Sequence, residues 1–553
     1  MKRLFLLILV LCVSYTLFAK GASEKTTQGT AYTRETAMQP NSRVRNIIVM
    51  IPDGMSSDNI TLARWYKAYD AAANTVDPSV TLTLDELSSG LVRTWWTNGK
   101  IIGAITDSAP AGTAFATGIK TNDKFIGVTP ESKPAATILE AARLIGKSTG
   151  IVATSNVQHA TPAAFTSHYN DRNRYDIIAE QQAYNCIDVI LGGGSLYMAP
   201  PYRQDSENMI DEMKAMGYQY ISTRDELNAV KGGKVLGLFA PDALAYEMDR
   251  GENKPSEPSL SEMTAKAIEI LSHNAKGFFL MVEGSKVDWS AHANDPIGVI
   301  SDVLEFDAAV KVALDFAKEK QNTMVIIMSD HGNGGISIGS ALTDNSYSSD
   351  PVVKFIAPLK KAQLTGEGIF EKFDKNFANA SEVMSQYFGI DDLTKEETDA
   401  IKATGTEAWK MSYVAGPIIS KRACLGWTTT GHTGEETILF TYLPGNSRIV
   451  GTLENTDIPK ICAGVWGIDL PALTKGLYIE AGPAFVKKGA IMEIDTSVRS
   501  NGTMTVTLGS TTLLIRENKN YVTKNGQNVP VRGVIVNQGG NFYVSQEVLD
   551  LIE

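Results

Sequence analysis

Three of the six histidines in this 553-residue chain stand in short groupings that are typical of metal ligands. Asp288 and His292 are four positions apart, a spacing that places both side chains on one face of a helix. Asp330 and His331 are adjacent and follow an apolar run, and His432 lies in a Gly-His-Thr-Gly segment. Neutral imidazoles combined with carboxylates in a multi-metal site indicate hydrolysis of a phosphate ester or a related oxyanion.

Asp53 and Glu283 add carboxylates to this set, so the chain has ligands for more than one divalent cation. Ser108 lies in a run of small residues, where a helix can begin close to a bound anion because its first amides and its dipole favour negative charge. A cation in contact with the serine oxygen makes it an alkoxide nucleophile. A simple helix cap formed by Asp107 and Ser108 is the alternative interpretation.

Arg172 stands in the polar segment Asn-Asp-Arg-Asn-Arg and has forked donors that can bind two phosphate oxygens at once. A solvated loop arginine is the ordinary alternative. Asp288 with His292 could likewise be a surface pair, and Asp330-His331 a capped strand end. The two groupings together are far more specific than either alone.

Short apolar runs rich in branched residues recur along the chain and suit strands that are covered on both faces, at residues 47–51, 150–153, 187–191, 278–282, 324–328 and 438–441. Residues 305–320 place apolar side chains on one face at helical spacing. Strands that alternate with helices predict an α/β fold with a doubly wound, largely parallel sheet and helices on both faces. Asp53, Glu283 and Asp330 follow such strands, at the carboxyl ends where ligands bind in these sheets.

We expect four regions along the chain, at residues 1–22, 23–45, 46–490 and 491–553. Residues 46–490 form the catalytic domain, and residues 335–425 form an insertion over the site with short capped helices near 380–389 and 393–403. Residues 491–553 form a small β-rich domain with strands at 503–508, 511–516 and 521–524. This tail contains no histidine or cysteine and therefore carries none of the metal chemistry.

The N-terminus predicts export. Residues 1–22 have two basic residues, a short apolar stretch and small residues near Ala19 and Ala22, which is typical of a signal peptide, with a transmembrane anchor as the alternative. Residues 23–45 read as a flexible lead-in. The mature protein is expected in the periplasm or outside the cell, with no attachment to a membrane after cleavage.

The formal net charge of −11 argues against nucleic acid as a partner but does not exclude a small phosphate substrate, because a local metal cluster outweighs diffuse surface charge. Three cysteines remain after signal cleavage. Their odd number and scattered spacing predict three buried free thiols, Cys186, Cys424 and Cys462; a disulfide between Cys424 and Cys462 is the alternative.

Taken together, these residues resemble the alkaline phosphatase family over roughly residues 45–480. Six segments occur in the family's order: Pro52-Asp53-Gly54-Met55, Thr106-Asp107-Ser108-Ala109, Gln158-His159-Ala160-Thr161-Pro162-Ala163-Ala164, Val282-Glu283-Gly284 through Asp288 and His292, Asp330-His331-Gly332, and His432-Thr433-Gly434.

The resemblance implies three metal positions. A first zinc ion is held by Asp288, His292 and His432. A second zinc ion is held by Asp53, Asp330 and His331 and is joined by Ser108 as the nucleophile. A magnesium ion shares Asp53 and adds Thr161 and Glu283, while Arg172 clamps the phosphoryl oxygens.

The implied activity is hydrolysis of small phosphate monoesters through a phosphoserine. Two positions vary within the family: His159 stands where some members have an aspartate near the magnesium, and Trp289 where some have a lysine near the phosphate. His168 is expected to be structural. Family members are often dimers, so a homodimer is possible.

Three alternative functions fit these residues less well. A serine-type sulfatase needs an arginine where Gly112 stands. A phosphodiesterase of the same superfamily generally lacks the third metal site that Thr161 and Glu283 supply. An inactive phosphate- or metal-binding protein predicts the loss of a ligand or of the nucleophile, and none is lost. The tail from about residue 492 loosely resembles the small domain named after the N-terminal domain of copper amine oxidases, which suggests attachment to the cell envelope.

Overall fold

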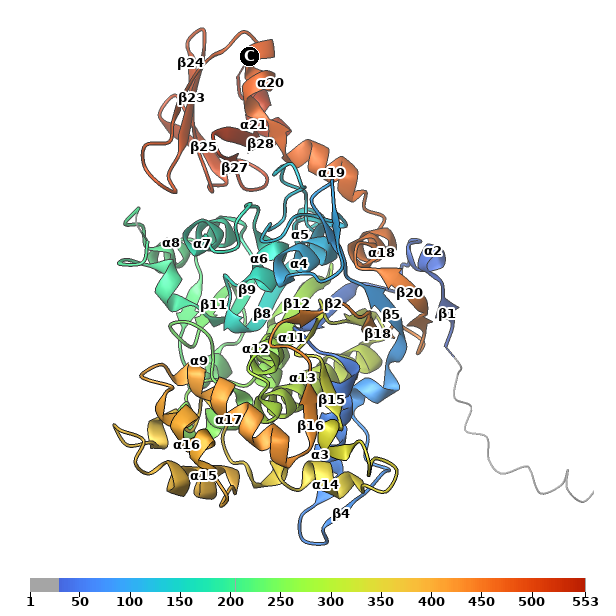
Figure 1. Ribbon diagram of the computed structural model, residues 1–553. Helices are drawn as coiled ribbons and strands as arrows, with labels where there is room; N and C mark the ends of the chain where they lie inside the picture. The colour runs from blue at the N-terminus through green and yellow to red at the C-terminus, as the bar shows by residue number, and fades with distance from the viewer. Residues whose placement is uncertain (1–28, 204, 553) are drawn as a thin grey trace, which may run out of the picture.

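The computed structural model describes residues 29–203 and 205–552, so the predicted signal peptide lies outside the described residues. The centre of the molecule is a ten-stranded sheet (Figure 1). Its strands lie in the order β10 (Gln219–Ile221), β11 (Val235–Leu238), β9 (Val189–Gly193), β8 (Ser148–Asn156), β12 (Phe278–Gly284), β2 (Asn46–Pro52), β13 (Thr323–Ile327), β18 (Thr437–Tyr442), β5 (Ser88–Arg93) and β20 (Gly451–Glu454).

The seven strands from β10 to β13 are parallel, and β18 joins this block antiparallel to β13. Every residue of β2 is buried because both faces of the sheet are covered. Ile47, Val49 and Ile51 enter one core, and the alternate residues Ile48 and Met50 enter the other. The predicted largely parallel α/β sheet is therefore confirmed.

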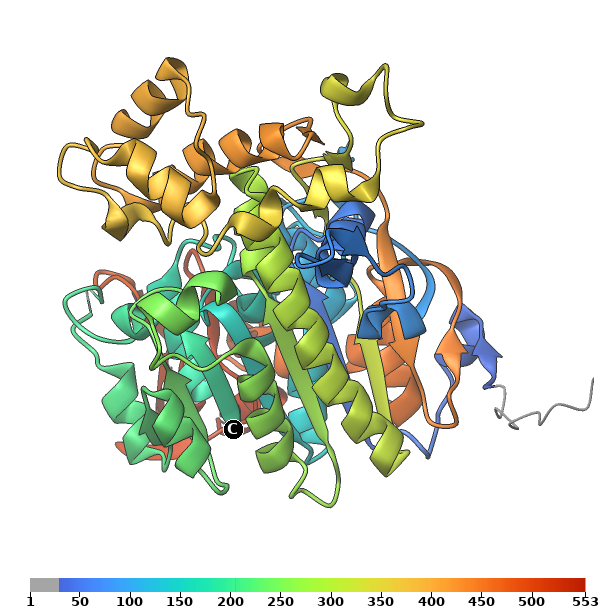
Figure 2. The ribbon, with the colours of Figure 1, turned by 90° about the horizontal axis from the view of Figure 1, so that it is seen from below.

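Helices cover both faces, as expected for a doubly wound fold. One face packs against α3 (Ser57–Ala68), α11 (Leu260–Leu271) and α13 (Pro296–Lys320), and the other against α5 (Ile138–Leu144), α7 (Tyr175–Tyr184) and α18 (Asp457–Trp466). Asp295 begins α13 by accepting hydrogen bonds from the amides of Ile297 and Gly298, with Pro296 in the first turn. Figure 2 shows α13 lying along the sheet, with residues 335–425 beyond the end at which this helix begins.

The region predicted as an insertion is a helical unit with its own apolar core. It contains α14 (Val352–Ile356), α15 (Ala380–Phe388), α16 (Lys395–Lys402) and α17 (Ala408–Arg422). Its two ends lie side by side because β15 (Ile336–Ile338) pairs antiparallel with β16 (Leu425–Trp427). The Thr394 hydroxyl accepts from the Glu397 amide, which forms the predicted capping box of α16.

The C-terminal region is a β-rich domain that begins earlier than predicted. The predicted strands match β23 (Thr503–Leu508), β24 (Thr511–Arg516) and β25 (Tyr521–Lys524) of a five-stranded antiparallel sheet completed by β22 (Ile491–Asp495) and β26 (Gln527–Pro530). However, β21 (Ile479–Glu480) pairs with β28 (Asn541–Val544), and α20 (Ala481–Lys487) shares this domain's core. The structural boundary therefore lies near residue 479 rather than 491.

Buried polar contacts join this domain to the catalytic domain. The Lys519 ammonium lies 2.7 Å from a Glu180 carboxylate oxygen and 2.8 Å from one of Glu207. The Tyr478 hydroxyl, just before β21, donates to Glu140 at 2.5 Å and lies 2.7 Å from Nε2 of the fully buried His168. His168 is thus part of a structural contact, as the sequence predicted.

The lead-in and the cysteines complete the fold. Within the lead-in, described from residue 29, β1 (Ala31–Tyr32) pairs parallel with β19 (Arg448–Ile449), and α2 (Arg34–Ala37) follows it. The described part of the lead-in is thus paired with the catalytic domain. Cys186, Cys424 and Cys462 are free thiols, which confirms the expected three thiols, and the alternative pairing of Cys424 with Cys462 is not formed. In the described part of the chain, no helix combines the length and apolar character needed to cross a membrane.

Candidate metal centre and active site

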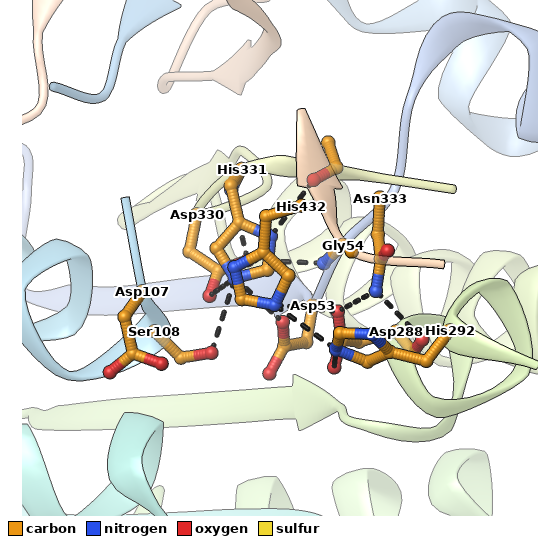
Figure 3. A network of polar contacts seen from close by, with 12 residues as sticks. Asp53, Gly54, Asp107, Ser108, Asp288, His292, Asp330, His331, Asn333 and His432 are labelled. Carbon is orange, nitrogen blue, oxygen red and sulfur yellow. Dashed lines mark hydrogen bonds and ion pairs between the residues drawn. The ribbon is translucent and has the colours of Figure 1, made fainter. Parts of the chain in front are cut away.

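The predicted metal ligands meet at the carboxyl ends of the central strands. Asp53 follows β2, Glu283 lies near the end of β12, and Asp330 and His331 follow β13. Because β12, β2 and β13 are adjacent and parallel, their last residues lie at one edge of the sheet. Figure 3 shows the side chains of Asp330, His331 and His432 gathered around Asp53.

A first ligand group consists of Asp288, His292 and His432. Asp288 and His292 are one turn apart on α12 (Lys286–His292), and their side chains approach to 3.4 Å. His432 comes from the far side of the insertion, on β17 (His432–Thr433), which pairs with β14 (Gly332–Asn333) next to His331. The Nε2 atoms of His292 and His432 are 3.1 Å apart, so their lone pairs converge on the same point.

A second ligand group consists of Asp53, Asp330 and His331, all fully buried. His331 Nε2 lies 3.1 Å from Asp330 Oδ2 and 3.5 Å from Asp53 Oδ1. The His331 and His432 rings stack at 3.6 Å, which places the two groups side by side. A pair of adjacent cation sites can clamp both the attacking and the departing oxygens of a phosphoryl transfer.

Ser108 is the first residue of α4 (Ser108–Thr117), as the sequence predicted. Asp107 is the cap of this helix, because its carboxylate accepts from the Ala109 amide at 3.2 Å. The Ser108 hydroxyl is therefore not needed as a cap, and it lies 3.2 Å from His331 Nε2 (Figure 3). A buried hydroxyl at a helix N-terminus beside a metal-ligand group has the surroundings of an activated nucleophile.

A third group surrounds the other side of Asp53. Ligand atoms of Asp53, His159 and Glu283 lie within 4.8 Å of one another. Thr161 is buried on α6 (Ala160–Thr166). In the described chain, the following buried atoms lack a hydrogen-bond partner: both carboxylate oxygens of Asp53, Thr161 Oγ1, Glu283 Oε1 and Asp330 Oδ2. Buried oxygens without a partner are costly, and coordination of a divalent cation satisfies them.

Backbone carbonyls orient the three imidazoles. The Nδ1 atom lies 2.7 Å from the Thr430 carbonyl in His292, 2.8 Å from the Thr106 carbonyl in His432, and 3.2 Å from the Gly332 carbonyl in His331. A carbonyl only accepts, so each Nδ1 carries the proton and each Nε2 presents a lone pair to the centre. This is the arrangement expected of metal-ligating histidines.

The cluster binds protons when no cation is present. Burial, together with the charges of Asp330, Asp288 and Glu283, raises the pKa of Asp53 well above its ordinary value. Burial likewise raises the pKa of Glu283 to about 8. Burial opposes the charged form of His331, but the Asp330 carboxylate outweighs it and raises the pKa of His331 to about 9. Divalent cations therefore replace protons here when they bind.

The Arg172 side chain is only 15% exposed and is not a solvated loop side chain. One Nη1 hydrogen is donated to Asp107 Oδ1 at 2.5 Å, and Nη2 donates to His159 Nε2 at 2.9 Å. Burial and the Arg172 charge lower the pKa of His159 to about 3, so its ring is neutral. The Trp289 ring lies edge-on to His159 at 5.7 Å. These contacts hold the guanidinium against Asp107, the residue before Ser108, and against His159.

Sequence reasoning missed several residues that position these ligands. Asn333 donates to Asp288 Oδ1 at 2.6 Å and to its carbonyl at 3.1 Å. The Ser329 hydroxyl accepts from the Met55 amide at 2.8 Å and joins the ends of β2 and β13. In the sequence, Asn333 is distinguished only by its place directly after Asp-His-Gly. That place does not predict a hydrogen bond to Asp288, which is 45 positions away.

The comparisons with known proteins agree with this geometry. Residues 44–467 match the family model described as alkaline phosphatase. Alkaline phosphatase 4 of Bacillus subtilis is 37% identical over 433 residues, which are 76% of this chain and 89% of that protein. The structure of Thermus thermophilus alkaline phosphatase has a TM-score of 0.68 at 26% identity, covering 81% of this chain and 96% of that one.

A third comparison concerns a histidine-to-aspartate mutant of the alkaline phosphatase from the Antarctic bacterium TAB5, described with Mg bound in its M3 site. It has a TM-score of 0.56 at 25% identity, covering 77% of this chain and 99% of that one. The family model spans most of the sequence, and the three relatives described above are all named alkaline phosphatases. The protein therefore belongs to the alkaline phosphatase family and is a metal-binding hydrolase of phosphate monoesters.

Proposed function

We propose that this phosphatase uses two zinc ions and one magnesium ion, held by three sets of residues. The first zinc set is Asp288, His292 and His432. The second is Asp53, Asp330 and His331. The magnesium set is Asp53, Thr161 and Glu283. The imidazole-rich sets suit zinc, whereas the oxygen donors of the third suit magnesium. Metal analysis of the purified protein tests this stoichiometry, and a ratio other than two zinc ions to one magnesium ion would contradict it.

Ser108 is the proposed nucleophile. Its oxygen forms a bond to phosphorus while the ester oxygen leaves as the alcohol, and a water molecule then releases phosphate from the phosphoserine. Bound cations supply the Lewis acidity that stabilises the serine alkoxide and the departing oxygen. Arg172 binds the phosphoryl oxygens through its forked donors and offsets their charge.

The observation that carries this mechanism is the position of the Ser108 hydroxyl, 3.2 Å from His331 Nε2 at the start of α4. We expect Ser108→Ala to lower turnover of a simple aryl phosphate by about 10³-fold or more, because it removes the attacking atom. The variant should keep its metal ions, since Ser108 is only one contact among many. Near-normal turnover in a correctly metallated Ser108→Ala protein would refute the assignment.

The structure adds a packing argument against a sulfatase. That activity needs an arginine at position 112, where a Cβ would lie 3.0 Å from the Ala164 Cβ and leave no room for a long side chain. An inactive binding protein is separated from an enzyme by measuring phosphate release with and without a chelator. Metal binding without phosphate release would favour the binding protein.

His159 bears on the third metal. We propose that its neutral ring lies beside the magnesium set and allows zinc to compete there, because imidazole favours zinc over magnesium. The same metal analysis, repeated with excess zinc, tests this point. A third zinc ion that displaces magnesium is the expected result, and retention of magnesium would contradict it.

Export, assembly and attachment are further proposals. Residues 1–22 would be cleaved on export to the periplasm or the cell exterior, which the N-terminal sequence of the secreted protein tests. A homodimer would be detected by sedimentation, and a monomer would refute it. The β-rich domain would attach the enzyme to the cell envelope, so its removal should release activity from washed cells.

A further inference from the structure

A cavity of about 580 Å³ opens beside the first ligand group. It lies between α12, the loop that follows β11 and helix α17 of the insertion. His292 lines this cavity and also belongs to the first ligand group. A leaving group bound at that group therefore extends into the cavity.

Four of the twelve residues that line the cavity are Trp or Tyr, and the proposed mechanism gives Trp409 and Tyr413 no role. Tyr246 is buried and Trp289 is partly buried. Trp409 and Tyr413 are one turn apart on α17, with their rings 5.7 Å apart and nearly perpendicular. Trp409 is 51% exposed and Tyr413 is 42% exposed, which is unusual for large rings and leaves their faces open to a ligand.

The charged side chains around the cavity favour a polar but uncharged group. Lys286 is 3% exposed, and its ammonium lies 4.3 Å from the ring centroids of both Tyr246 and Trp289. Within residues 29–203 and 205–552, no hydrogen bond or ion pair engages this ammonium, so its hydrogens are available to a ligand acceptor. Asp242 and Glu367 also line the cavity and repel a second anionic group.

We propose that this cavity binds the base of a nucleoside 5′-monophosphate whose phosphate is cleaved at Ser108. The inference rests on the proposed function and names its substrate class. Nucleobases stack on aromatic side chains whatever their identity, because every base has a π-face. Their ring nitrogens and carbonyls accept from Lys286, and their amino groups donate to Asp242 or Glu367. The acidic side chains select monophosphates over substrates that carry further phosphates.

The test uses two substrates with the same scissile bond. Adenosine 5′-monophosphate and ribose 5-phosphate both release a primary 5′-oxygen, so the ratio of their kcat/KM values reports only on the adenine. We expect the protein to prefer the nucleotide by about tenfold or more, since stacking of one base supplies that much. If neither ester is hydrolysed, the proposed function fails; if both are hydrolysed equally, only the base site fails.

Variants of α17 test whether its aromatic rings cause the preference for the nucleotide. Trp409→Ala with Tyr413→Ala should lower the preference about tenfold, and Trp409→Phe should retain most of it because a flat ring remains. Tyr347→Ala is the matched control, since Tyr347 is a 77% exposed aromatic residue of the same insertion that does not line the cavity. The control should leave the ratio unchanged.

Sedimentation of the same variants separates a ligand site from a contact between copies of the chain. A double variant that dissociates while its substrate ratio stays constant assigns these rings to an interface and overturns the proposal. An equal fall in the ratio for Tyr347→Ala overturns it as well. A lowered ratio confined to the α17 variants, with unaltered sedimentation, supports it.

Discussion

Gly54 shows how closely the ligand groups are packed together. Its φ of +69° lies in the left-handed region, and its amide donates to Asp330 Oδ1 at 3.1 Å. A Cβ at this position would lie 2.7 Å from Asp288 Oδ1 and 2.8 Å from the Asp288 Cα. One glycine therefore touches a ligand of each proposed zinc ion, and both its backbone angle and its missing side chain are required.

We predict that Gly54→Ala weakens metal binding by about tenfold or more, because Asp288 must move to admit the methyl group. Zinc affinity measured by competition with a chelator checks this. Gly217→Ala is the control, since its φ is +90° but nothing lies within 4 Å of its Cβ. That variant should lose only about 1 kcal/mol of unfolding free energy to backbone strain, and an equal loss of zinc affinity would contradict the close-contact argument.

Residue types and order were enough to predict which side chains gather into groups that could hold metal ions, because histidines and carboxylates after strands have few structural uses in such numbers. The contacts that hold them were not predictable. Asn333 reaches Asp288 only because β14 pairs with β17 and brings this loop over α12. Lys286 reads as an ordinary helix residue until the fold places two aromatic rings against it.

At the scale of elements, the pattern of buried residues determined which helices and strands could be predicted from the sequence. The central strands were predicted from apolar runs, and the C-terminal strands from alternation. The first turns of α13 were missed because Pro296 through Val303 are buried on every side, so no polar face marks the helical period. Strand β11 is apolar but only four residues long, and the short strand β10 and the outer strands β5 and β20 carry too little apolar sequence to stand out.

Helix α13 also supports the site through Phe306. This ring is fully buried and lies so close to β12 that a Cβ on Gly284, beside Glu283, would be 2.9 Å from it. We predict that Phe306→Ala lowers the free energy of unfolding by about 3–5 kcal/mol and loosens the end of β12. Denaturant unfolding checks the value. Phe316→Ala, on the same helix but partly exposed, should cost clearly less, and equal losses would contradict the prediction.

At the scale of the whole molecule, the β-rich domain and the catalytic domain share a buried polar junction. His168 Nδ1 lies 2.8 Å from the Gly127 carbonyl, and its Nε2 lies 3.1 Å from Glu140. Gln538 of the β-rich domain donates to the His168 carbonyl at 3.2 Å. Burial opposes the charged ring, but the Glu140 carboxylate outweighs it and raises the pKa of His168 above its ordinary value.

This junction predicts a pH-dependent stability. A raised histidine pKa stabilises the fold fully below the unfolded value of about 6.5, and the contribution is lost as the pH rises through the folded value. We therefore expect His168→Gln to lower the free energy of unfolding by about 3 kcal/mol at pH 6 and by less at pH 10. Melting temperatures at the two pH values check this, with exposed His273→Gln as the control. A difference that grows with pH would contradict the charge assignment.

The junction through Lys519, Tyr478 and Gln538 also sets the orientation of the β-rich domain relative to the catalytic domain. Because these contacts are buried, a hinge motion of the β-rich domain would have to break them. Figure 1 places this domain at one end of the molecule and helices α15 to α17 at the other. A surface bound by the far end of the β-rich domain would therefore lie at the end of the molecule opposite the cavity lined by α17.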